Sequence, residues 1–127
     1  MFEKLGLTRM AQALAAHSGE RVAVVARNIA NADTPGFRAM DMPDFRTLYG
    51  DPASFTPRRT RAGHIMNEES HLHQPVPSGS GMAPNGNNVS LDQQMMKAVA
   101  ARQSHEMALA VYRNTSEILR TSLGRKS

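Results

Sequence analysis

The chain of 127 residues contains no cysteine and no tryptophan, and aromatic residues make up only 5% of it. The missing cysteine excludes disulfides, thiol nucleophiles and thiolate metal sites. No uninterrupted apolar run approaches the roughly 20 residues that a membrane-spanning helix requires. The N-terminal residues show no basic segment followed by an apolar core, so we expect no cleaved secretory signal. If the protein leaves the cytosol, we expect it to use an export route that needs no conventional secretory signal.

Flexible and small apolar side chains take the place of the missing aromatics. Hydrophobic residues make up 40% of the chain and include nine methionines. Such residues favour helices with close, adaptable contacts over a dense aromatic core. The formal charge of +4 bears on solubility and association rather than on fold.

The first long segment with helical periodicity covers residues 2–31. Its apolar residues recur at spacings of three and four, apart from one wider step. Thr8 is a candidate N-cap for the main part of this helix. The segment is either one amphipathic helix or two helices in tandem that meet at Ser18-Gly19, because a glycine inside a helix costs about 1 kcal/mol relative to alanine.

The second helix is predicted over residues 90–123. The segment Ser90-Leu91-Asp92-Gln93 has the pattern of a capping box, and no glycine or proline follows until Gly124. Arg102–Glu106 and Arg113–Glu117 are pairs of opposite charge spaced four residues apart, which support an exposed helix face.

This second helix carries more apolar surface than one neighbour can cover. One stripe comprises Leu91, Met95, Ala98, Leu109, Tyr112, Leu119 and Leu123, and a second comprises Met96, Val99, Met107, Val111 and Ile118. A helix packed against a single neighbour needs one stripe. The extra face therefore points to other copies or other subunits. The helix-packing residues that we expect are Leu14, Val25, Met95, Val99, Leu109, Tyr112 and Leu119.

The middle of the chain is rich in proline and glycine and shows no sustained apolar period. We expect it to be largely irregular, with short extended pieces around 45–49 and 64–66 and a flexible linker at 75–81. The organisation predicted is an N-terminal helix and turn at 1–37, an irregular middle at 38–88 and a C-terminal helix at 89–127.

Residues able to carry chemistry are sparse. His64, His71 and His73 include a possible transition-metal pair, but no cysteine or well-spaced carboxylate accompanies them. The basic cluster Arg58-Arg59-Thr60-Arg61 lacks the interleaved aromatics of a base-stacking surface. A lone helical histidine such as His17 is more often packed than ligating. We therefore expect no catalytic residue, metal or cofactor.

The most specific stretch follows the first helix. Thr34 precedes a proline and is pushed out of the helical region. Pro35 and Gly36 suit the two central positions of a type II turn, and Phe37 returns an aromatic ring to the helix that has just ended. Short polar side chains before the proline, including Asn28 and Asn31, can bond the loosened backbone.

The order Asn28-Ile29-Ala30-Asn31-Ala32-Asp33-Thr34-Pro35-Gly36-Phe37 resembles the signature near the N-terminus of the flagellar axial proteins, the rod and hook family. Residues 60–65, 85–92 and 119–125 are similar to other segments of the short proteins in this family. Phe37 stands where tyrosine is frequent, and Asn85 where aspartate is usual. The resemblance makes these residues candidates for subunit packing: Asn28, Ile29, Asn31, Thr34, Pro35, Gly36 and Phe37.

The resemblance implies a mainly α structural protein and not an enzyme. In this family the N- and C-terminal helices pair as an antiparallel coiled coil, and these coiled coils self-assemble into the hollow periplasmic rod of the flagellar basal body, which serves motility. The implied partners are other copies, the rod subunits FlgC and FlgF, the adaptor FliE with the membrane ring, and the type III export apparatus. No cofactor, nucleic acid or small-molecule substrate is implied.

The short length indicates a subunit of the proximal rod, and FlgC itself is an alternative of similar size. From another class, a small basic helical protein that binds nucleic acid is the competing hypothesis. It would require a basic stripe along one helix face.

The capping box provides a direct test of where the last helix begins. Replacing Ser90 and Gln93 together by alanine should remove two helix-start bonds and cost about 1–2 kcal/mol of helix stability. Circular dichroism of a peptide covering 85–127 should show reduced helicity. Unchanged helicity would show that the assigned start is wrong.

Overall fold

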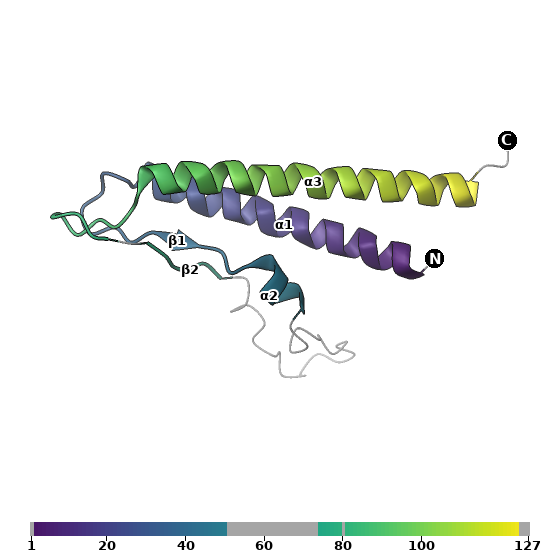
Figure 1. The fold of residues 1–127 in the computed structure, drawn as a ribbon, viewed down its shortest axis with the longest axis horizontal. Coiled ribbons are helices and arrows are strands. Elements are labelled where there is room, and N and C mark those ends of the chain that lie inside the picture. Colours follow the sequence, from purple (N-terminus) through teal and green to yellow (C-terminus); the bar gives the residue numbers. More distant parts are fainter. Residues whose placement is uncertain (1, 51–73, 80, 125–127) are drawn as a thin grey trace, which may run out of the picture.

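The computed structural model of the chain describes residues 2–50, 74–79 and 81–124. Helix α1 spans Phe2–Ala30 and helix α3 spans Leu91–Gly124. Between them lie strand β1 at Met40–Asp41, helix α2 at Phe45–Gly50 and strand β2 at Val76–Pro77. The two long helices run antiparallel and side by side, so the start of α1 and the end of α3 lie at the same end (Figure 1). The predicted mainly helical fold with long terminal helices is confirmed.

Helix α1 is continuous through Ser18-Gly19, so of the two alternatives the single helix is correct. Ser18 is buried, and a side chain carbon added at Gly19 would lie 4.0 Å from the ring of His105 in α3. Packing against a neighbouring helix offsets the low helix propensity of these residues. The prediction that Thr8 caps the helix is wrong, because its hydroxyl donates to the Lys4 carbonyl oxygen, 2.9 Å away, inside the helix.

The two long helices meet along a line of small or polar side chains that we call the seam. Seven of its buried members recur every seven residues: Ala11, Ser18 and Val25 in α1, and Gln94, Ala101, Ala108 and Thr115 in α3. Asn28 is a further buried residue, three positions after Val25. Asn28 Nδ2 lies 2.9 Å from Gln94 Oε1, and His105 Nδ1 lies 2.9 Å from the Ala15 carbonyl oxygen. These two contacts define an antiparallel register in which residues 11, 18 and 25 lie level with 108, 101 and 94.

The residues expected to pack between the helices are placed differently from one another. Val25 is fully buried in the seam. Leu14, Leu109, Tyr112 and Leu119 are partly buried. Met95 and Val99 are 57% and 69% exposed and lie outside the seam, so their role in helix packing stays a prediction. The apolar stripes missed the true seam because it includes the polar residues Gln94 and Thr115.

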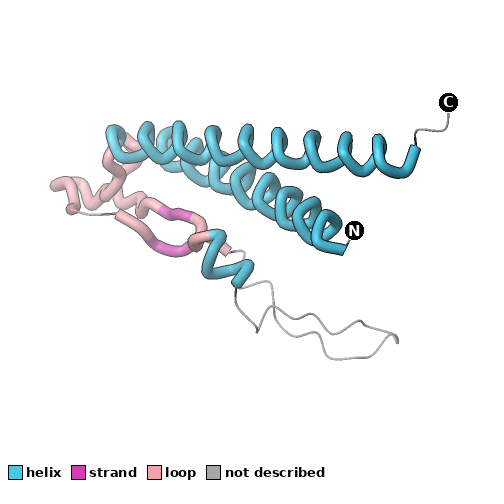
Figure 2. Tube along the Cα trace, turned by 45° about the vertical axis from the view of Figure 1, so that its right-hand side comes forward, coloured by secondary structure: helices cyan, strands magenta, loops and turns pink. Residues whose placement is uncertain are grey.

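Part of the middle region forms a short antiparallel ribbon beside α1 (Figure 2). Met40 pairs with Pro77 and Asp41 with Val76. The Ser78 amide donates to the Ala39 carbonyl oxygen at 2.8 Å. The predicted linker at 75–81 is therefore wrong at β2, where pairing with β1 satisfies the backbone.

The predicted extended piece at 45–49 is helix α2. The Leu48 amide donates to the Asp44 carbonyl oxygen at 3.2 Å, which closes the first turn. Phe45 and Tyr49 stack with ring centres 5.3 Å apart, and Leu48 is buried. The apolar spacing here is three and four, the period of a helix, and His17 of α1 packs 5.6 Å from the Phe45 ring.

Several predicted features lie outside the described residues. They are the extended piece at 64–66, the similarity at 60–65, the basic cluster Arg58–Arg61 and the histidines His64, His71 and His73.

Candidate functional site

Helix α1 ends in the turn that the sequence predicts. The Phe37 amide donates to the Thr34 carbonyl oxygen at 3.2 Å, and Gly36 has a φ of 74°. A positive φ at the third residue is what a type II turn requires, and glycine adopts it without steric cost. The chain therefore reverses at Pro35 and Gly36.

Polar side chains of the helix end hold the residues before this turn. Asn31 Nδ2 donates to the Arg27 carbonyl oxygen at 2.8 Å, and the Thr34 hydroxyl donates to Asn31 Oδ1 at 3.2 Å. The Thr34 amide also donates to the Asn31 carbonyl oxygen at 3.1 Å. Local side-chain bonds thus replace the helical ladder where it stops.

A second segment, immediately before α3, closes over the turn. Asn87 is only 4% exposed, and its Nδ2 lies 2.9 Å from each of three carbonyl oxygens, those of Asn31, Ala32 and Thr34. Its Oδ1 accepts from the Val89 amide at 2.7 Å. One buried side chain therefore satisfies backbone groups that the end of α1 leaves open.

Backbone contacts join the same two segments. The Gly36 amide donates to the Asn85 carbonyl oxygen at 3.0 Å, and the Asn88 amide donates to the Phe37 carbonyl oxygen at 3.3 Å. A side chain carbon on Gly86, whose φ is 84°, would come within 3.4 Å of the Gly36 Cα atom. We call the joined segments 28–40 and 85–88 the elbow clamp.

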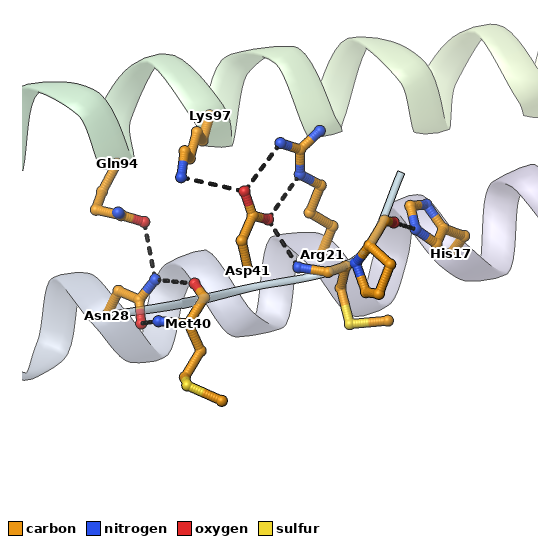
Figure 3. Close-up of polar contacts among 9 residues, drawn as sticks. His17, Arg21, Asn28, Met40, Asp41, Gln94 and Lys97 are labelled. Atoms are coloured by element: carbon orange, nitrogen blue, oxygen red, sulfur yellow. Dashed lines mark hydrogen bonds and ion pairs between the residues drawn. The ribbon is translucent and has the colours of Figure 1, made fainter. Parts of the chain in front are cut away.

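Asn28 connects the elbow clamp to both long helices (Figure 3). It is 1% exposed. Its Nδ2 donates to the Met40 carbonyl oxygen at 2.6 Å and to Gln94 Oε1 at 2.9 Å, and its Oδ1 accepts from the Met40 amide at 3.1 Å. A single amide therefore bonds α1 to β1 and to α3. Gln94, its partner, is also 1% exposed.

An ion cluster lies beside Asn28 in the same view (Figure 3). Asp41 of β1 bonds Arg21 of α1 through two contacts at 3.0 and 3.2 Å, and Lys97 of α3 at 3.1 Å. Burial raises the pKa of Asp41, but the hydrogen bonds and charges of Arg21 and Lys97 outweigh it and hold that pKa below its usual range. The cluster joins the same three elements as Asn28.

The arrangement fixes the relative directions of the elements that it joins. Among the described residues, no three His, Asp or Glu side chains gather closely enough to hold a metal ion. No helix in the described part of the chain is long and apolar enough to cross a membrane. What the site does is set the angle between the end of α1, the β ribbon and the start of α3.

Comparison with known proteins identifies the family. A sequence model described as flagella basal body rod protein matches residues 6–38, which cover most of α1 and the turn. The flagellar basal body rod protein FlgB of Agrobacterium fabrum is 31% identical over 93 residues, covering 68% of this chain and 69% of that protein. The chain belongs to the flagellar basal-body rod proteins. Similarity to a FlgB-type protein favours that type over the FlgC alternative.

The structure brings together most of the residues that carry the rod-family motif. Six of them bond within the elbow clamp through side chain or backbone: Asn28, Ile29, Asn31, Thr34, Gly36 and Phe37. Pro35 is exposed at the turn, and Ile29 is partly buried. Their role in subunit packing stays a prediction.

Sequence reasoning missed five polar residues of this rod-family site: Arg21, Asp41, Asn87, Gln94 and Lys97. Two of them left a signal in the sequence. Asn87 lies in the segment similar to the family before its last helix, and Gln94 stands one seven-residue step before Ala101. The ion cluster left no local signal, because its three members come from three separate elements.

Replacing Asn87 by alanine should loosen the elbow clamp. Three carbonyl oxygens would lose their buried donor, so the free energy of unfolding should fall by about 1–3 kcal/mol. Denaturant unfolding followed by circular dichroism measures the loss. Asn114→Ala, at an exposed position of α3, is the matched control and should change stability little. Equal effects of the two variants would contradict the clamping role.

The ion cluster predicts a specific pH dependence. Because the pKa of Asp41 is lower in the folded state, its carboxylate stabilises the fold above its unfolded pKa of about 3.9. This stabilisation disappears as pH falls through the folded pKa. The free energy of unfolding, measured across the acidic range, should fall less in Asp41→Asn than in the parent. Exposed Asp44→Asn is the control; an unchanged acid slope in Asp41→Asn would refute this.

Proposed function

We propose that this chain is a structural subunit of the proximal flagellar rod, which polymerises through its terminal helices at the base of the drive shaft. The observation that carries the proposal is the elbow clamp, in which the rod-family motif and the segment before α3 meet in one buried joint. A rigid joint between two long helices suits a load-bearing subunit. It offers no chemistry for turnover.

We further propose that α1 and α3 act as an antiparallel coiled coil. The seven-residue recurrence of buried side chains in both helices supports this, because that repeat keeps one seam facing the partner helix. Small residues at the seam allow a close approach. Large apolar residues are left on the outside, where neighbouring subunits can cover them.

The proposed partners are other copies of this chain, the rod subunits FlgC and FlgF, and the adaptor FliE with the membrane ring at the rod base. Delivery is proposed to be through the type III export apparatus. Membership of the rod family supports assembly with rod subunits in general. The exposed apolar residues of α3 give such partners a surface to cover.

The nucleic-acid hypothesis finds no support in the described helices. Acidic residues interrupt the positive ones along the exposed side of both helices, at Glu20 in α1 and at Glu106 and Glu117 in α3. Binding to duplex DNA with a steep salt dependence would favour that hypothesis over the rod.

Gly36 allows a test of the proposed function. Gly36→Val places a β-branched residue at a φ of 74° and should strain the turn by about 1–3 kcal/mol. A side chain carbon added at Gly36 would meet no other atom within 4 Å, so the strain comes from the backbone conformation. In a deletion strain, the variant should be exported but poorly incorporated, with few complete basal bodies and poor swimming.

Gly36→Asn is the matched control, since asparagine tolerates a positive φ better than other residues. It should restore basal bodies and swimming where Gly36→Val does not. Normal rods and motility with Gly36→Val would contradict the proposed role of the turn. Normal motility in the deletion strain itself would contradict the rod function.

A further inference from the structure

The outer side of α3, turned away from the seam, carries an exposed apolar face. Met95, Met96, Val99 and Met107 are 57%, 74%, 69% and 57% exposed. At 100° per residue they lie on the side of the helix opposite the seam residues Ala101 and Ala108. We call these four residues the Met–Val face. Large apolar side chains gathered on one face mark an interaction surface.

The outer side of α1 is of a different kind. Alanine recurs there every seven residues, and longer polar side chains stand between the alanines. The exposed residues of this side, at spacings of three and four, are Arg9, Gln12, Ala16, Glu20, Ala23, Arg27 and Ala30. We call these seven residues the alanine face. The small side chains leave gaps between the polar ones, into which long flexible methionines can pack.

The charges beside the two faces are complementary when a second copy is placed next to the first by a sideways shift, so that the Met–Val face of one copy meets the alanine face of the other. From the elbow end, the alanine face carries Arg27, Glu20 and Arg9, in the order plus, minus, plus. Along α3 from the same end, exposed Asp92, Arg102, Glu106 and Arg113 follow in the order minus, plus, minus, plus, and Arg102 and Glu106 also pair with each other at 3.3 Å. In the register of the seam, Arg27 is level with Asp92, and Glu20 falls within one turn of Arg102.

We propose that the Met–Val face of one copy docks on the alanine face of a second copy, helix against antiparallel helix. This inference rests on the proposed rod function and names the contact between its subunits. The two faces lie on opposite sides of the helix pair, so the contact is head-to-tail. A head-to-tail contact between two copies leaves one Met–Val face and one alanine face unpaired, so further copies can add. The result is an open helical array or a ring.

A twofold pairing of two Met–Val faces is the competing arrangement. The twofold axis would then pass through the centre of the face, at the level of residue 101 along α3. This pairing places Arg102 of one copy opposite Arg102 of the other. Like charges placed directly opposite are unfavourable. The alanine face, in contrast, supplies Glu20 near this position. Charge thus selects the head-to-tail arrangement.

The absence of cysteine makes disulfide trapping a clean test, because introduced cysteines are the only ones in the chain. Ala16 and Gln103 are exposed and level with each other at the centres of the two faces. The full-length double variant Ala16→Cys with Gln103→Cys should give a ladder of linked chains in motile cells of the complemented deletion strain. The out-of-register pair Ala16→Cys with Asn114→Cys should cross-link about tenfold less, since disulfide geometry is specific.

A second level pair, Ala23→Cys with Met96→Cys, keeps the test decisive where the first variant fails to assemble. Strong linking by Gln103→Cys alone would indicate the twofold arrangement and overturn the proposal. Linking only to a different rod protein would overturn the choice of a second copy. Swimming cells in which neither level pair links would refute this contact and leave the rod function standing, whereas loss of the rod function is shown by the deletion strain itself.

Discussion

The buried bond between Asn28 and Gln94 is the contact on which the arrangement of the chain depends. Asn28 stands near the end of α1, and its amide also bonds both backbone groups of Met40. The partner amide of Gln94 is itself almost fully buried. A buried amide left without partners costs about 1–3 kcal/mol, so any other arrangement of these three elements carries a penalty. The bond selects one geometry, even where its net contribution to stability is small.

The small residues of the seam do not fix the register of the two helices, so a specific polar contact is needed. Ala101 and Ala108 recur at equal steps and would fit the facing helix almost as well after a shift of seven residues. Polar residues at single positions in a helix seam are known to specify register. The Asn28–Gln94 bond and the Asp41 cluster break this equivalence at the elbow end, where the Asn87 contacts also tie α3 to the turn. Polar groups therefore set the register of α1 and α3, and the small seam residues set how closely the two helices approach.

Local patterns in the sequence were enough to predict the two long helices and the type II turn. Periodicity determines the first, and the conformational limits of Thr34, Pro35 and Gly36 determine the second. Prediction failed where tertiary contacts decide the outcome. Packing keeps α1 helical across Gly19, β1 pairs with β2, and α2 forms where a short extended piece was expected. Gln94 escaped notice because a buried amide resembles a surface residue until its partner is known, and that partner, Asn28, lies 66 positions away.

The distribution of side chains is inverted relative to that of an independent domain. Amide side chains are buried and the Asp41 carboxylate is partly buried where the elements cross, while Met95, Met96, Met107 and Val99 lie exposed on the outer side of α3. In a monomer the exposed apolar groups gain nothing from folding, because burial of apolar surface supplies most of the driving force. The same distribution is favourable in an array, where each polar joint holds a helix pair rigid and the apolar faces are covered by neighbours. In the proposed array, rigidity within a subunit and adhesion between subunits thereby come from different residues. A rod that transmits torque needs both, since a loose joint would absorb rotation even when the contacts between subunits hold.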